Sequence, residues 1–355
     1  MLNKLVATTL FCFAACPVFA AGVGAPDSWH VEARPKVLAQ ELKFSNAGAN
    51  LVGTVYLPET GDRLAAVVAL HGASDPTRDQ ALYRHLKQGL PAMGVAVLVY
   101  DRRGSGESSG NRQRADYETL ADDAIAGKRA LAKLPRIDPA KIGFWGLSQG
   151  GWLSVLAAAR DASSAFAISI SAPLVTPEKQ MEFATANLLT VRGYSQEEVE
   201  HMLAARRAWL AYLRGSAPRA AAVDALRQVE AQPWFHLAFL PTASKLTGEP
   251  EQTTARKEMD YDPIPTVRSA RAPLLFIYGG ADPWVPVAES VKQLDSLSKQ
   301  QKNIRFAVLG DANHEMMFQA KETMAFDAKA TAENAPQAAA YFVLLSSWLT
   351  QHLGP

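Results

Sequence analysis

Cysteine is almost absent from this chain of 355 residues. The two cysteines, Cys12 and Cys16, both lie within the first twenty positions. From position 21 onward, the sequence therefore excludes a disulfide framework, a thiol nucleophile and a cysteine-based metal site. The rest of the chain needs no covalent cross-link, which is compatible with export to an oxidising compartment.

The chain also has almost no net charge. The chain has 36 Lys and Arg residues against 35 Asp and Glu residues, and removal of Lys4 with a leader would make the two numbers equal. Such a protein has no strong overall field to attract nucleic acid or an anionic membrane. We expect no nucleic-acid partner, and the sequence leaves the oligomeric state open.

No apolar run reaches the roughly 20 residues that a membrane span needs. The first residues instead combine a single charge, Lys4, with the apolar run 5–13 and the small residues of Val18-Phe19-Ala20. This three-part pattern predicts a cleaved signal peptide over residues 1–20 and a secreted or periplasmic protein. Lipid attachment at Cys16 is an alternative, although the residues before it match a lipoprotein signal poorly.

Short apolar runs alternate with helical patterns along much of the chain. Continuous runs such as 64–70 and 95–100 are typical of strands buried on both faces. Strands that alternate with helices predict an α/β fold with a mostly parallel sheet, covered by helices on both faces. We expect strands at 51–57, 64–70, 95–100, 141–145, 166–170, 274–278 and 304–309. We expect helices at 80–90, 116–133, 149–160, 287–298 and 337–349.

The alternation stops between about residues 176 and 262, where only helical signals are found. Ser195 and Glu198 form a capping-box pattern at the start of one predicted helix. Aromatic residues are frequent here, and they either form a small core or line an acyl pocket: Trp209, Tyr212, Trp234, Phe235 and Phe239. We expect a signal peptide (1–20), a leader (21–40), an α/β core (41–173 and 263–355) and a helical cap insertion (174–262).

The sharpest chemical signal is Gly146-Leu147-Ser148-Gln149-Gly150. It matches G-x-S-x-G between an expected strand and an expected helix of small residues. Glycines on both sides permit the strained turn that lifts a serine hydroxyl above a sheet. The pattern predicts Ser148 as a nucleophile, and the alternative is a glycine-rich turn with a helix-capping serine.

A serine nucleophile needs a base, and the base needs a third group to orient it. His314 follows the last expected strand, where the carboxyl ends of parallel strands gather reactive groups. Asp282 follows the strand 274–278 and would hold the histidine in the correct tautomer. Asp311 is the fallback for this acid. A loop-stabilising histidine and a turn aspartate beside Pro283 are the structural alternatives.

Acyl transfer also needs hydrogen-bond donors for the oxyanion that develops on the substrate. Two backbone N–H groups are candidates: that of Gln149, directly after the nucleophile, and that of Ala73, in the loop after the strand 64–70. The preceding His71-Gly72 pair would let the backbone approach a substrate closely. A tight turn is the alternative for this pair.

A further motif, Asp101-Arg102-Arg103-Gly104-Ser105-Gly106-Glu107-Ser108, resembles the D-x-R-G-x-G-x-S loop of esterases, proline iminopeptidase-like enzymes and prolyl-oligopeptidase relatives. With these motifs, the chain resembles the α/β-hydrolase superfamily from about residue 40 to the C-terminus. The resemblance implies a carboxylic ester, thioester or amide substrate and an acyl-enzyme intermediate. It implies a structural role for the loop 101–108.

Single residues argue against some other branches of that superfamily. Epoxide hydrolase and dehalogenase relatives use an aspartate nucleophile, whereas position 148 holds serine. Dienelactone hydrolase relatives use cysteine, which is missing after Cys16. No metal-ligand spacing and no glycine-rich phosphate loop is present, so we expect neither a metal nor another cofactor.

The leading hypothesis is an exported carboxylesterase, in which Trp284, two residues after Asp282, contacts the substrate. The alternative is a serine peptidase that acts on short peptides or aminoacyl amides. It would need an acidic anchor for the substrate amine, for which Glu178, Glu182 and Glu197 are candidates. A non-catalytic binding protein is a third hypothesis, but it has no need for a complete set of catalytic groups.

Overall fold

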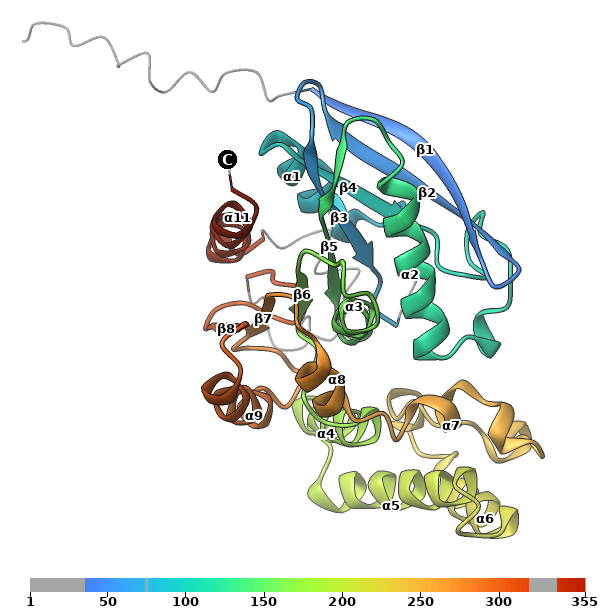
Figure 1. The fold of residues 1–355 in the computed structure, drawn as a ribbon. Helices are drawn as coiled ribbons and strands as arrows, with labels where there is room; N and C mark the ends of the chain where they lie inside the picture. Colours follow the sequence, from blue (N-terminus) through green and yellow to red (C-terminus); the bar gives the residue numbers. More distant parts are fainter. Residues whose placement is uncertain (1–35, 74–75, 319–336, 355) are drawn as a thin grey trace, which may run out of the picture. The chain divides into compact units, whose positions relative to one another are not determined.

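The computed structural model describes residues 36–73, 76–318 and 337–354, and these are organised around one eight-stranded sheet (Figure 1). The order across the sheet is β1-β2-β4-β3-β5-β6-β7-β8. β1, β2 and β4 pair antiparallel, and every pair from β4 to β8 is parallel. The predicted mostly parallel sheet is confirmed. The strands are β1 (Val37–Asn46), β2 (Ala49–Pro58), β3 (Leu64–Leu70), β4 (Val95–Tyr100), β5 (Ile137–Leu147), β6 (Ala167–Ile170), β7 (Leu274–Gly279) and β8 (Ile304–Leu309).

Both faces of the sheet are apolar and covered by helices. Alternate residues of β3 point to opposite faces: Ala66 and Val68 belong to one buried cluster, and Val67 and Ala69 to the other. Helices α2, α3, α8 and α9 contribute to the first cluster, and α1 and α11 to the second. The bounds are α1 (Leu90–Ala92), α2 (Tyr117–Leu131), α3 (Gln149–Arg160), α8 (Pro263–Ser269), α9 (Val287–Gln300) and α11 (Ala339–Leu353).

The segment between β6 and α8 is helical and has apolar clusters of its own (Figure 1). We call it the helical insertion; its α-helices are α4 (Pro177–Val191), α5 (Gln196–Leu213), α6 (Arg219–Val229) and α7 (Thr254–Glu258). The predicted capping box at Ser195 and Glu198 is confirmed. Trp234 and Tyr212 are buried in the two clusters, Trp209 and Phe235 pack against them, and Phe239 is 55% exposed.

Two parts of the core differ from the expectation. β1 lies partly within the stretch expected to be a leader, and it pairs with β2 through a tight turn in which Ala47 and Gly48 have positive φ angles. β1 is a partly exposed edge strand, so its apolar pattern is weak. The expected helix at 80–90 is broken into a 3-10 turn (Ala81–Tyr83), a π-helical turn (His85–Gly89) and the short α1.

The predicted signal peptide and both cysteines lie outside the described residues. Within the described ranges, no helix is both long and apolar enough to span a bilayer. Export and the four-part division of the chain stay predictions.

A buried ion pair joins the first hairpin to α2. The Arg103 guanidinium donates to both carboxylate oxygens of Asp123, at 3.0 and 2.5 Å, and Asp123 is completely buried. Arg103 also donates to the Asn46 carbonyl, and the Asn46 amide donates to Asp123 at 2.8 Å. Burial of these charges is compensated only while every partner is present.

We therefore expect Asp123→Ala to lower the free energy of unfolding by about 3–5 kcal/mol, because it leaves the Arg103 charge buried without its counterion. Urea denaturation followed by circular dichroism measures this loss. Asp295→Ala is the matched control, since its ion pair with Lys299 is solvent-exposed and is worth at most about 1 kcal/mol. An equal effect of the two substitutions would contradict the interpretation.

Candidate active site

Ser148 lies in a strained turn between β5 and α3. Its backbone has φ of +56° and ψ of −122°, a conformation that costs a non-glycine residue about 1–3 kcal/mol. A Cβ at Gly146 would overlap the Gly150 carbonyl group, and a Cβ at Gly150 would overlap the Leu70 carbonyl oxygen. The Ser148 N–H donates to the Ile170 carbonyl at 2.7 Å, and the residue is half-buried. The predicted strand–turn–helix geometry around Ser148 is therefore present.

Asp282 and His314 are directly hydrogen-bonded. His314 Nδ1 lies 2.7 Å from Asp282 Oδ2, and the Asp282 side chain is fully buried. The other oxygen, Oδ1, accepts from the N–H groups of Trp284 and Val285 at 2.8 and 3.2 Å. These bonds stabilise the carboxylate and fix its direction. Asp311, the fallback acid, is exposed and makes no such bond among the described residues.

The loop after β7, which carries Asp282, and the loop after β8, which carries His314, are in close backbone contact. Gly279, the last residue of β7, lies so near the loop after β8 that a Cβ would overlap the carbonyl oxygens of Ala312 and Asn313. The Ala281 N–H donates to the Ala312 carbonyl at 3.1 Å. The Asn313 side chain accepts from the N–H groups of Glu315 and Met317, which closes the turn that carries His314.

The charge of Asp282 controls the protonation of His314. Burial alone lowers the pKa of this histidine, but the Asp282 carboxylate, through its charge and its hydrogen bond, outweighs burial and raises the pKa. Glu315 adds in the same direction. Because Nδ1 donates to Asp282, the neutral ring has Nε2 free to accept a proton, and Nε2 has no partner among the described residues.

Ser148, Asp282 and His314 follow β5, β7 and β8, at the carboxyl edge of the parallel sheet. No hydrogen bond joins the Ser148 hydroxyl to His314 within the part of the chain that the structure describes. Such bonds are often long in an enzyme without substrate and shorten in the complex. The arrangement fits a nucleophile, a base and an acid in the roles that the sequence predicts.

The two predicted oxyanion donors lie on neighbouring segments. A Cβ at Gly72 would be 3.6 Å from the Cβ of Ser148, so the loop that carries Ala73 runs beside the nucleophile. Arg112 donates to the Ala73 carbonyl at 2.8 Å. Among the described residues, the N–H groups of Ala73 and Gln149 have no hydrogen-bond acceptor, which leaves both available to a substrate oxygen.

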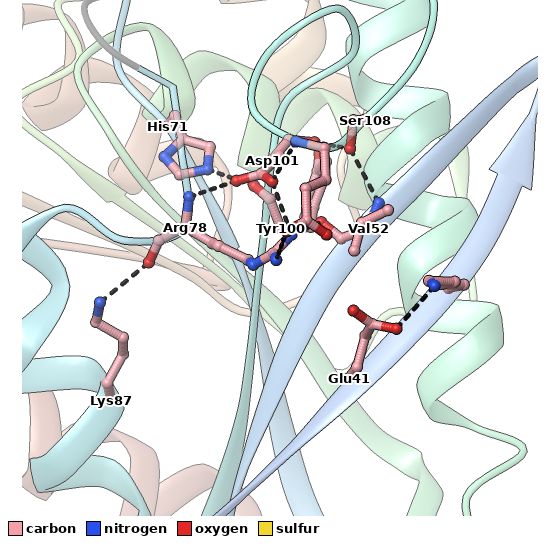
Figure 2. A network of polar contacts seen from close by, with 10 residues as sticks. Glu41, Val52, His71, Arg78, Lys87, Tyr100, Asp101 and Ser108 are labelled. Carbon is pink, nitrogen blue, oxygen red and sulfur yellow. Dashed lines mark hydrogen bonds and ion pairs between the residues drawn. The ribbon is translucent and has the colours of Figure 1, made fainter.

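His71 has a structural role. Its Nε2 donates to the Tyr100 carbonyl at 2.6 Å (Figure 2). Its Nδ1 accepts from the Tyr83 hydroxyl at 2.9 Å. Burial and the nearby Arg102 lower its pKa to about 3, so the ring stays neutral. A permanently neutral histidine that uses both nitrogens is not available as a base.

Trp284 joins the core to the helical insertion. Its carbonyl accepts from Gln180 of α4 at 3.1 Å, and the neighbouring Pro283 carbonyl accepts from Asn187 at 2.9 Å. Its ring packs edge-on against Phe239, with a centroid distance of 5.9 Å. The Phe239 backbone has a positive φ of +51°, and the preceding Ala238 carbonyl accepts a bond from the buried Arg206. An aromatic pair from two segments therefore lies two residues from Asp282.

Two polar residues near Ser148, Arg102 and Glu258, were not predicted as site residues. Arg102 donates to the Gln149 side-chain oxygen at 2.7 Å, and the Gln149 amide donates to Glu258 of α7 at 3.2 Å. Burial raises the pKa of Glu258 to about 7, although Arg102 and Tyr117 act in the opposite direction. These contacts join segments 47 and 109 residues apart, so no local pattern marks them. Only the D-x-R-G motif singles out Arg102.

The acids suggested as amine anchors are engaged elsewhere or exposed. Glu178 pairs with Arg214, Glu182 pairs with Arg207 at 3.4 Å, and Glu197 is exposed in the first turn of α5. In the ranges covered by the structure, no group of three His, Cys, Asp or Glu residues could hold a metal ion.

Comparison with known proteins agrees with this geometry. Residues 67–326 match the model of the alpha/beta hydrolase family. The chain belongs to the α/β-hydrolase family. The thiohydrolase aneE of Aspergillus aculeatus is 27% identical over 293 residues, which are 77% of this chain and 86% of that protein. The polyketide transferase claH of Penicillium crustosum is 43% identical, but over 23% of this chain and only 27% of its own length.

Solved structures of the same fold include an esterase and a peptidase. The Pyrococcus furiosus esterase PF2001 gives a TM-score of 0.55 at 16% identity, covering 90% of this chain and 92% of that one. Proline iminopeptidase of Mycobacterium smegmatis gives 0.54 at 15% identity, covering 88% and 98%. At these identities the likeness shows the fold alone. Family membership itself supports a hydrolase that acts on small molecules.

The His314–Asp282 contact predicts a measurable titration. His314 should keep its proton to a higher pH than a free imidazole, because ionised Asp282 stabilises the cation. Asp282→Asn removes that charge and should lower the His314 pKa. Imidazole resonances followed by NMR against pH, and assigned through His314→Gln, measure both values. Asp311→Asn is the control and should leave the titration unchanged; the opposite ranking of the two variants would exclude Asp282 as the partner.

Proposed function

We propose that this protein is an exported serine hydrolase that cleaves carboxylic esters through an acyl-enzyme intermediate. The observation that carries the proposal is the 2.7 Å bond between His314 and the buried Asp282, at the same sheet edge as the strained turn of Ser148. A buried carboxylate that orients a histidine is the arrangement that activates a serine hydroxyl. The pattern of residues 1–20 supports export.

The reaction would proceed in two halves. Ser148 Oγ attacks the ester carbonyl carbon while His314 Nε2 takes the hydroxyl proton, and the oxyanion is held by the N–H groups of Ala73 and Gln149. The tetrahedral intermediate collapses, the alcohol leaves with the proton from His314, and an acyl-serine remains. Water then gives its proton to His314 and attacks the acyl carbon, which releases the carboxylic acid and restores Ser148.

Thioesters belong to the same substrate class, since only the leaving atom differs. The similarity to a thiohydrolase over most of the chain makes them the second group to test. Amide cleavage is the alternative, and the three acids first considered as amine anchors give it no support. Oxygen esters are preferred to amides in this proposal, because an alcohol leaves with less assistance from the enzyme than an amine does.

The first experiment compares the exported protein, whose first residue we expect to be Ala21, with Ser148→Ala. The wild type should hydrolyse p-nitrophenyl esters and react with a fluorophosphonate label. Ser148→Ala should lose both activities and keep its circular dichroism spectrum, because the change removes only the attacking oxygen. Acyl thioesters and aminoacyl-p-nitroanilides are assayed in parallel. Preferential anilide cleavage would support the peptidase alternative over the esterase proposal. A wild type without turnover or labelling would overturn the proposal.

Substrate choice should depend on the aromatic pair formed by Trp284 and Phe239. Because the Phe239 ring is more than half exposed, we expect Phe239→Ala to raise the KM for long acyl chains and to spare kcat for acetate esters. Steady-state kinetics over graded acyl lengths measures this. Met93→Ala is the control, since Met93 is also exposed but lies just before β4, at the opposite edge of the sheet. A KM that rises equally for every chain length would argue against an acyl-binding role.

A further inference from the structure

Arg102 contacts two separate chain segments, one of which carries the residue directly after Ser148. It is the second residue after β4 and is only 6% exposed. One guanidinium nitrogen, Nη2, donates to the His71 carbonyl at 2.5 Å. The other, Nη1, donates to the Gln149 side-chain oxygen at 2.7 Å. The planar fork of arginine holds two acceptors at a fixed separation, which a lysine cannot do.

These two acceptors belong to the two halves of the proposed oxyanion hole. His71 lies two residues before Ala73, and Gln149 itself bears the second donor. The peptide units that must aim their N–H groups at one substrate oxygen are therefore linked through a single side chain. A link of this kind has a direct catalytic consequence, since misplaced donors stabilise the transition state less than aligned ones.

The backbone and the loop that carry Arg102 are fixed by several hydrogen bonds. The Arg102 N–H donates to the Pro76 carbonyl at 2.9 Å. The carboxylate of the preceding Asp101 accepts from the N–H and the guanidinium of Arg78, at 2.8 and 2.7 Å (Figure 2). It also accepts from the Glu107 N–H at 2.9 Å. The Ser108 hydroxyl donates to the Asp101 carbonyl and accepts from the Val52 N–H, which fixes the loop to β2 (Figure 2).

The charge of Arg102 is not cancelled locally. Both of its hydrogen bonds go to neutral oxygens, and no carboxylate lies within ion-pair distance of it among the described residues. Glu258 is one step further away, on the other side of the Gln149 amide. A buried cation without a direct counterion is costly, and it favours negative charge that develops nearby.

We propose that Arg102 is the positioning residue of the oxyanion hole, which holds the Ala73 loop and Gln149 in register with each other. This inference rests on the proposed acyl transfer. Arg102 does not touch the substrate; it acts through the two segments that do. Gln149 then has two roles. Its backbone N–H donates to the oxyanion, and its side-chain oxygen accepts the hydrogen bond from Arg102.

The first test is Arg102→Lys, which keeps the charge and loses the fork. We expect kcat for the best oxygen ester to fall by about 10- to 100-fold, somewhat less than the loss caused by removing a donor outright. KM should change little, because oxyanion donors act mainly in the transition state. Gln149→Ala keeps the N–H but removes one attachment, so it should give a smaller loss of the same kind and also serves if Arg102→Lys does not fold.

A matched thionoester separates this role from general damage. Its C=S sulfur is a weak hydrogen-bond acceptor, so its hydrolysis depends less on well-aligned donors. The ratio of oxygen-ester to thionoester turnover should therefore fall in Arg102→Lys and in Gln149→Ala. Arg103→Lys is the matched control, because Arg103 is the adjacent buried arginine but pairs with Asp123. It should lower stability and leave the ratio unchanged.

The outcomes are distinct. An active wild type, with unchanged turnover of both substrates in Arg102→Lys and Gln149→Ala, would overturn the inference and leave the proposed function intact. Equal losses with both substrates would make Arg102 a structural residue only, which also overturns it. A wild type that does not hydrolyse either ester would overturn the proposed function and the inference with it. A fallen ratio, absent in Arg103→Lys, supports the positioning role.

Discussion

The close approach of backbone at the Ser148 turn is the constraint on which the site depends. Gly146 and Gly150 have no room for a Cβ, and Gly150 lies against the Leu70 carbonyl at the end of β3. One contact therefore places the strained serine, the start of α3 and the loop that carries Ala73 next to one another. The strain at Ser148 is sustained by the buried strands on either side of it, which make the turn part of the core rather than a free loop.

Buried charge is the second organising feature, and each buried ion has a separate set of partners. Asp282 is bound by His314 and by two backbone N–H groups, Arg103 by Asp123, and Arg102 by neutral oxygens alone. A buried ion is tolerated when hydrogen bonds replace its hydration. Asp282 and Arg103 meet this condition with opposite charges nearby. Arg102 meets it with hydrogen bonds to neutral oxygens alone, and on this ground we propose a functional role for it beside the site of developing negative charge.

The sequence predicts those parts of the molecule that local patterns encode. Continuous apolar runs marked β3 and β4, and the glycine spacing marked Ser148, because burial on both faces and a tight turn each restrict residue types nearby in the chain. β1 was not predicted, because an exposed edge strand needs no strong apolar pattern. Arg102 and Glu258 were not predicted as site residues for a different reason. Their partner, Gln149, is distant in the chain, and a hydrogen bond between distant side chains leaves no periodic signal in the sequence. Asp282 and His314 could be paired from the sequence, because each follows a parallel strand and the carboxyl ends of parallel strands lie at the same edge of the sheet.

The helical insertion contacts the site through hydrogen bonds at two places and through the ring contact of Phe239 with Trp284. α4 donates to the carbonyls of Pro283 and Trp284, beside Asp282, and Glu258 of α7 accepts from Gln149, beside Ser148. The apolar clusters of the insertion are its own, separate from the two that flank the sheet. A segment with an independent core and directional hydrogen bonds at its base can change its surface without disturbing the catalytic residues. Under the proposed function, selection for a new acyl group would then act on the insertion, through residues such as Phe239, while the geometry around Ser148 stays fixed by the core.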